Sequence, residues 1–94
     1  MKVKAVFKGI MKDWVGAAES DFDLKPGASY GDLLREIHLK FGRNLPSGLW
    51  NRKRKAFDES VVALVEGSGE KLDELATPLR EGMRVDFFLL ALGG

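Results

Sequence analysis

The first third of the chain shows the pattern of two strands. Apolar side chains occupy every second position from Val3 to Phe7, mostly between lysines, and a period of two predicts a strand with one buried face. A second strand is predicted over residues 19–24, where Phe22 and Leu24 share a face. Residues 9–16 begin and end with glycine and predict a turn or loop, so the two strands are expected to form a hairpin.

Residues 30–41 have the spacing of a helix with one buried face. Apolar side chains and one histidine recur there at helical intervals: Tyr30, Leu33, Leu34, Ile37, His38 and Phe41. Ser29 and Asp32 have the spacing of a capping box, in which hydroxyl and carboxylate each accept a hydrogen bond from a backbone N–H at the helix start. Gly42 is expected to be the C′ residue, the position just past a helix that glycine commonly fills.

The second half of the chain is predicted to supply two more strands. Residues 61–65 are uniformly apolar, as if buried on both faces, and residues 85–92 form the last strand. A long connection, residues 43–57, precedes them, and connections of this length are often functional. Between the two strands, three leucines have the spacing of a short helical turn that Pro78 ends: Leu72, Leu75 and Leu79.

The order of these elements predicts an α+β domain. The single helix is too short to bury itself, so it must pack on one face of a mixed sheet. Because strand crossovers are right-handed, a later strand is expected to run parallel to the first, and we expect it to be the last one. A sheet that holds one helix in this order is a β-grasp, or ubiquitin-like, arrangement.

Composition narrows the possible functions. The 94 residues suit a single domain, residues 1–94, and the net charge of +1 gives no general attraction to nucleic acid or to an anionic membrane. There are no cysteines, which excludes disulfides, thiolate metal sites and cysteine nucleophiles. The lysine-rich start is unlike a signal peptide, and the longest uncharged apolar run is too short to span a bilayer. A cytoplasmic protein is therefore expected.

Two glycines, Gly93 and Gly94, follow the last predicted strand. Without a Cβ their backbone can lie flat and enter a narrow slot, and the only reactive group that such a tail offers is its carboxylate. We expect a flexible tail of about residues 91–94 that presents the Gly94 carboxylate to the active site of another protein.

Several short motifs occur in a characteristic order. Residues 29–34 read Ser-Tyr-Gly-Asp-Leu-Leu, residues 65–67 read Val-Glu-Gly, and residues 77–82 read Thr-Pro-Leu-Arg-Glu-Gly, with the two glycines at the end. In this order they resemble the ubiquitin-like sulfur-carrier family, which includes the small subunit of molybdopterin synthase and the thiamine sulfur-carrier protein. The chain departs from that family before the tail, where residues 89–92 read Leu-Leu-Ala-Leu in place of a frequent Pro-Pro.

The resemblance implies a carrier and not an enzyme. An adenylating enzyme of the ubiquitin-activating type would use ATP to convert the Gly94 carboxylate into an acyl adenylate, and a sulfur donor would then produce a thiocarboxylate. The carrier itself would bind no cofactor. The sulfur would pass to the large subunit of molybdopterin synthase, or to an equivalent acceptor enzyme, in molybdopterin or tungsten-pterin synthesis.

Three other functions stay open at this point. The chain could carry sulfur for thiamine or another pathway. It could be a protein modifier, with Gly94 joined to lysines of other proteins. It could also be a plain ubiquitin-like interaction domain in which the two glycines have no chemical role.

The outward side of the last strand is a candidate partner-binding surface. Arg84 and Asp86 define the outward register, which continues through Phe88, Leu90 and Leu92. An apolar row beside a reactive tail indicates a binding patch. The alternative is that residues 43–57 fold over this row and make it part of the core.

Other residues that could carry chemistry are expected to serve packing or solvation. His38 has no cysteine or second histidine with which to bind a metal, so no metal site is predicted. Trp14 and Trp50 are expected to cover the core from loops. The basic run at residues 52–55 is expected to lie in a solvated loop, with contact to an acidic partner as the alternative.

Overall fold

The structure is a computed structural model of the chain and describes residues 1–90. The expected tail at about residues 91–94 therefore lies outside the described residues. The helices and strands occur in the order β1 (Lys2–Phe7), α1 (Ile10–Val15), β2 (Glu19–Asp23), α2 (Tyr30–Phe41), the 3₁₀ helix η1 (Gly42–Asn44), β3 (Trp50–Asn51), β4 (Ala56–Phe57), β5 (Val61–Val65) and β6 (Arg84–Leu89).

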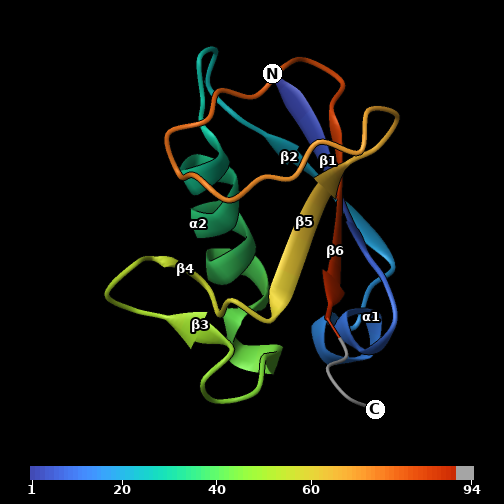
Figure 1. The fold of residues 1–94 in the computed structure, drawn as a ribbon, viewed down its shortest axis with the longest axis vertical. Helices are drawn as coiled ribbons and strands as arrows, with labels where there is room; N and C mark the ends of the chain where they lie inside the picture. The colour runs from blue at the N-terminus through green and yellow to red at the C-terminus, as the bar shows by residue number, and fades with distance from the viewer. Residues whose placement is uncertain (91–94) are drawn as a thin grey trace.

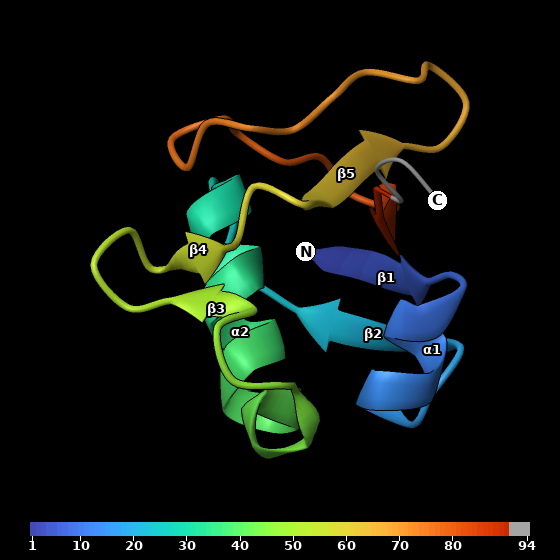
Figure 2. The ribbon, with the colours of Figure 1, turned by 60° about the horizontal axis from the view of Figure 1, so that its bottom comes forward.

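Four strands form one mixed sheet in the order β2-β1-β6-β5 (Figure 1). β1 and β6 are parallel neighbours at its centre, whereas β1 with β2 and β5 with β6 are antiparallel pairs. α2 lies on one side of this sheet, and both views show it there (Figure 2). The predicted α+β class and β-grasp arrangement, with parallel first and last strands, are therefore confirmed.

The core lies between α2 and the sheet. Leu33, Leu34 and Ile37 of α2 are at most 1% exposed, and Phe41 packs against the core from a partly buried position. Phe87 of β6 is fully buried, with its ring 5.8 Å from the rings of both Phe7 and Phe57. Full burial of a large apolar side chain contributes about 1.5–3 kcal/mol, so this layer supplies most of the driving force for folding.

The start of α2 has the predicted capping box. The Asp32 N–H donates to the Ser29 hydroxyl at 3.3 Å, and the Ser29 N–H donates to the Asp32 carboxylate at 2.8 Å. The next residue, Tyr30, donates its backbone N–H to the Thr77 carbonyl at 2.8 Å, which ties the helix start to the loop before β6. Local sequence and one long-range contact thus fix the same helix boundary.

Residues 10–15 form the helix α1, so the prediction of a turn or loop over residues 9–16 is wrong. Gly9 and Gly16 flank this helix with φ of 58° and 83°, and the left-handed Gly16 ends it. Met11 and Val15, one helical turn apart, are buried in the core. Trp14 lies on this helix, not on a loop, and packs partly buried against the core.

Gly42 is not the left-handed C′ residue that the sequence predicts. Its φ of −54° and ψ of −33° are helical, because the chain continues from α2 into η1. The missing side chain matters for another reason, since a Cβ here would lie 2.9 Å from Nδ1 and 3.0 Å from Cε1 of His38. Glycine is needed at this position for space and not for backbone conformation.

The long connection at residues 43–57 ends in a small antiparallel hairpin, β3 with β4. Trp50 of this hairpin stacks on His38 of α2 with ring centroids 4.2 Å apart and an interplanar angle of 7°. The other hairpin strand brings Phe57 edge-on to the inward-facing Phe87. The hairpin therefore lies on the α2 side of the sheet (Figure 2).

β5 differs from its predicted burial on both faces. It is the edge strand of the sheet, and Val62 and Leu64 are only half-buried, whereas Ala63 and Val65 face the core. Residues 70–72 bond to its free edge, with the Leu72 N–H donating to the Ala63 carbonyl at 2.9 Å. From Val62 to Val65, half-buried and buried residues therefore alternate, although every residue of the strand is apolar.

The three leucines at 72, 75 and 79 do not form the predicted helical turn. Their segment is irregular, with a turn at residues 75–76, and it buries Leu72 and Leu79 while Leu75 is 37% exposed. Within residues 1–90, no helix is both long and apolar enough to cross a membrane.

Candidate partner-binding surface

β6 carries the chain from the centre of the sheet towards the tail. Its last hydrogen bond among the described residues joins the Leu90 N–H to the Ser60 carbonyl at 2.7 Å, and the Leu90 side chain is 47% exposed. Leu90 is thus anchored by its backbone while its side chain stays accessible. The predicted site residues Leu92, Gly93 and Gly94 lie outside the described residues.

Neighbouring residues of β6 face opposite sides of the sheet. Val85 and Phe87 are fully buried in the core, whereas Arg84, Asp86 and Phe88 point to the other face. The outward register predicted for Phe88 is therefore what the structure has, and the Phe88 side chain is half-buried there.

Three apolar residues from other strands share the outward face with Phe88. Val62 of β5 is paired directly with Phe88, and Leu64 of β5 and Val6 of β1 flank Asp86 on either side. Paired residues point to the same face of a sheet, so these four side chains lie together. We call Val6, Val62, Leu64 and Phe88 the outer sheet patch.

The sequence pattern indicates one member of this patch, Phe88, and does not indicate the other three. Val6 interrupts the lysine alternation of β1, and this is the signal that could have revealed it. Val62 and Leu64 could not be distinguished from their buried neighbours, because an unbroken apolar run carries no period.

Charged groups lie within and beside the patch, because Asp86 stands between Val6 and Leu64. Lys8 approaches the Asp86 carboxylate at 3.4 Å, and Lys4 approaches Glu19 at 3.1 Å. These are exposed or partly exposed pairs that contribute little to stability, typically about 0–1 kcal/mol each. Apolar residues mixed with charged ones are compatible with a protein–protein interface, since such interfaces are on the whole about as apolar as the rest of a protein surface.

The connection at residues 43–57 does not cover this face. Its hairpin packs against α2 and Phe87, on the opposite side of the sheet, so the alternative in which it buries the outward row is wrong. Within the part of the chain that the structure describes, the outer sheet patch is open to a partner.

The remaining chemistry-bearing residues lie away from the patch. His38 stacks on Trp50 and its Nδ1 is buried without a hydrogen-bond partner among the described residues. In residues 1–90 no group of histidine and carboxylate side chains could hold a metal ion. The basic run is exposed at the tip of the β3–β4 hairpin, where Asn51 Oδ1 accepts from the N–H groups of Lys53 and Arg54.

Comparison with known proteins gives a match in structure only. No family model matches the chain, and no curated protein matches it in sequence. Among solved structures, SAMP1, a small archaeal modifier protein from Haloferax volcanii, is similar with a TM-score of 0.82, 17% identity and 100% of both chains covered.

Two further structures give the same result. A protein from Pyrococcus furiosus described as molybdopterin converting factor, subunit 1, has a TM-score of 0.74 and 22% identity, covering 97% of this chain and 99% of its own. Urm1 from Trypanosoma brucei has a TM-score of 0.69 and 14% identity, with coverage of 99% and 95%. The described residues of the chain therefore have the ubiquitin-like β-grasp fold that these modifier and converting-factor proteins share.

Proposed function

We propose that this chain is a carrier whose Gly94 carboxylate is adenylated, converted to a thiocarboxylate and used as the sulfur source in molybdopterin or tungsten-pterin synthesis. The observation that carries the proposal is the β-grasp fold whose central strand β6 leads, four residues after Leu90, to Gly94. The similarity to the converting-factor subunit, over nearly the whole of both chains, favours this pathway over a thiamine-type one.

In this proposal the chain supplies a chemical handle and the partner enzyme supplies the catalysis. A carboxylate is a poor electrophile, and reaction with ATP converts it into a mixed anhydride with AMP, which is a good leaving group. A sulfur nucleophile then attacks the Gly94 carbonyl carbon and displaces AMP. The outer sheet patch and Leu90 would bind the adenylating enzyme or the sulfur acceptor, so that the tail reaches its active site.

Intact-mass spectrometry of the protein purified from its own host tests the carrier function. Replacement of one carboxylate oxygen by sulfur adds about 16 Da, and this gain at Gly94 is the expected result. Alkylation of the thiocarboxylate before digestion should locate the added mass on the C-terminal peptide. A carboxylate that is never modified, even with active cofactor synthesis in the host, would contradict the proposal.

Protein modification is the second candidate function. The observation in its favour is the similarity to SAMP1, which covers the full length of both chains. The same acyl adenylate would be attacked by a lysine amine, with release of AMP and formation of an isopeptide bond. Tagged protein purified under denaturing conditions should then show a series of heavier conjugates, which deletion of Gly94 should abolish.

A further inference from the structure

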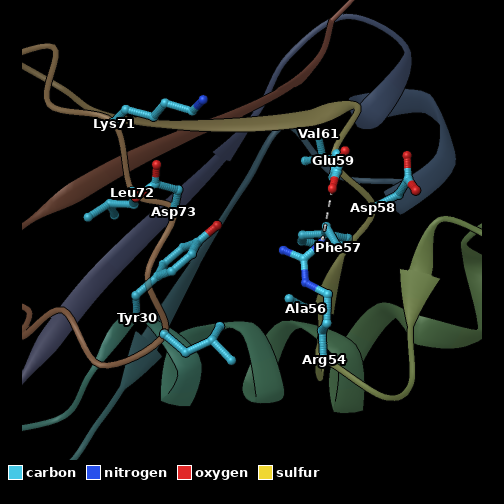
Figure 3. A pocket seen from close by; sticks show the side chains of 11 residues that line it. Tyr30, Arg54, Ala56, Phe57, Asp58, Glu59, Val61, Lys71, Leu72 and Asp73 are labelled. Atoms are coloured by element: carbon cyan, nitrogen blue, oxygen red, sulfur yellow. Dashed lines mark ion pairs between the residues drawn. The ribbon is translucent and has the colours of Figure 1, made fainter.

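A cavity of about 330 Å³ opens between the start of α2, the β3–β4 hairpin and the loop at residues 71–75 (Figure 3). Its lining includes no residue of the outer sheet patch. Small-molecule sites start at about 300 Å³, so the cavity has the volume for a ligand of a few heavy atoms.

The Tyr30 hydroxyl points into this cavity (Figure 3). Tyr30 is 6% exposed, and its ring stacks on Phe87 at 6.5 Å between centroids. Within the described residues, its hydroxyl has no hydrogen-bond partner. The hydroxyl faces the open cavity and not the closed core, so it is available to a molecule that binds there.

The phenol stays uncharged at physiological pH. Burial, and after it the negative charge of Asp73, raise the pKa of Tyr30 above its ordinary value, and the opposing effect of Arg54 is smaller. A neutral phenol can both donate and accept a hydrogen bond. It can therefore bind an anionic oxygen or an ammonium group.

Opposite charges flank the hydroxyl on two sides. Lys71 and Asp73 come from one loop, and neither makes an ion pair within residues 1–90. Arg54 reaches in from the hairpin and meets Glu59 at 4.0 Å, a loose and exposed contact. Asp58 and Glu59 also line the cavity, so three carboxylates and two cations face it. A ligand with only one sign of charge would face like charges here, whereas a ligand with both signs would find a partner for each.

The base of the cavity is apolar. Phe57 and Leu72, which are 5% and 3% exposed, line it below the charged groups. An apolar floor beneath separated charges suits a small molecule with one apolar substituent.

We propose that this cavity binds a free amino acid with an apolar side chain. Its ammonium group lies beside Asp73, its carboxylate beside Arg54 and the Tyr30 hydroxyl, and its side chain over Phe57 and Leu72. This site does not involve Gly94, so the binding experiment tests the proposal separately from the carrier function.

Three probes that share one side chain test this assignment. Leucine carries both charges, N-acetyl-leucine only the negative one and leucinamide only the positive one. In ¹H–¹⁵N NMR titrations of the full chain, leucine should shift the amides of Tyr30, Arg54, Lys71 and Asp73, and each capped analogue should bind at least about tenfold more weakly. Equal binding of N-acetyl-leucine or of leucinamide would overturn the proposal in favour of a simple anion or cation site. No shift with any probe would leave a cavity filled by water and would overturn it too.

Two conservative variants test the residues. Tyr30→Phe keeps the stacking on Phe87, and Asp73→Asn keeps the side-chain shape, yet each should weaken leucine binding by at least about tenfold. Glu74→Gln, next to Asp73 but outside the cavity lining, is the matched control and should bind leucine like the unmodified chain.

The melting temperature separates binding from a structural role. Because the Tyr30 hydroxyl has no partner in the described part of the chain, Tyr30→Phe should lower the melting temperature by no more than about 2 °C. A variant that melts much earlier and still binds leucine normally would show that the hydroxyl supports the fold, and the proposal would be wrong.

Discussion

Phe87 and Phe88 are adjacent in β6 and have opposite surroundings. Phe87 is fully buried against three other aromatic rings, so Phe87→Ala should cost about 3–5 kcal/mol of unfolding free energy. Phe88 is half-buried on the outer sheet patch, so Phe88→Ala should cost much less. It should instead weaken binding of the adenylating enzyme by more than about 30-fold, the loss expected for a truncated interface anchor.

Thermal melts and partner titrations of the same two variants check this contrast. Leu90→Ala, at an exposed site next to the patch, should behave like Phe88→Ala. If Phe88→Ala unfolds as easily as Phe87→Ala and shows no loss of affinity beyond unfolding, the outer face of β6 is not a recognition surface.

The capping box of α2 should give the protein a pH signature. The Ser29 backbone N–H is the largest cause that lowers the pKa of Asp32 below its ordinary 3.8, and the Ser29 hydroxyl adds to it. A carboxyl group whose pKa is lower in the folded state than in the unfolded state stabilises the fold. This stabilisation is complete at pH values above the unfolded-state pKa, and it is lost as the pH falls through the folded-state pKa. Asp32→Asn should therefore reduce the melting temperature at pH 7, with the difference from the unmodified chain shrinking below about pH 4.

Two variants control this pH experiment. Ser29→Ala removes the other half of the cap and should cost about 1 kcal/mol at neutral pH. Asp23→Asn changes an exposed carboxylate at the end of β2 and should leave the melting temperature nearly unchanged. A difference between Asp32→Asn and the unmodified chain that is constant from pH 7 to pH 2 would contradict the assignment.

At the scale of single elements, prediction from sequence succeeded where the signal is local. The sequence predicts α2 over residues 30–41, because its apolar stripe and its cap at Ser29 are both local signals. α1 was missed, because two flanking glycines indicate a loop and its buried face consists of only Met11 and Val15. The β3–β4 hairpin was missed too, since strands of two residues have no period and form here by packing on α2.

The junction of α2 with this hairpin gives a test of packing. Gly42→Ala would place a Cβ 2.9 Å from His38 Nδ1, and His38 cannot yield freely because Trp50 stacks on its ring. The substitution should cost about 1–3 kcal/mol, the range for overpacking. In a His38→Ala background the clash is absent and the backbone at Gly42 is helical, so the same change should be neutral or stabilise by up to about 1 kcal/mol.

The unmodified chain, Gly42→Ala, His38→Ala and the double variant form a double-mutant cycle. Urea denaturation of these four proteins gives the coupling energy between positions 38 and 42 directly. Equal destabilisation by Gly42→Ala in both backgrounds would show that the His38 contact is not the reason for glycine at this position.

At the scale of the whole molecule, the topology was predictable because few arrangements satisfy one helix, four strands and right-handed crossovers. The parallel pairing of β1 with β6 follows from those constraints and is what the structure has. The cavity around Tyr30 was not predictable, because its charged residues come from segments that only the tertiary fold brings together. Val62 and Leu64 of the outer sheet patch were not predictable either, because an unbroken apolar run carries no period, whereas the break in the lysine alternation could have revealed Val6.

Folding and tail chemistry should be separable in the intact protein. Within residues 1–90 the buried hydrophobic residues run from Val3 to Phe87, all of them before the glycine pair. Adding one alanine after Gly94 removes the Gly94 carboxylate and should abolish adenylation, measured as ATP–pyrophosphate exchange with the adenylating enzyme. The unfolding free energy should change by less than about 0.5 kcal/mol, as for surface changes.

One glycine inserted in the exposed turn at residues 66–68 is the matched control, because it lengthens the chain equally and leaves the tail intact. That variant should be adenylated normally. Intact-mass measurement must show that the added alanine is still present after the reaction. If the extended chain is then still activated, the Gly94 carboxylate is not the reactive group, and the β-grasp domain would act through its sheet surface alone.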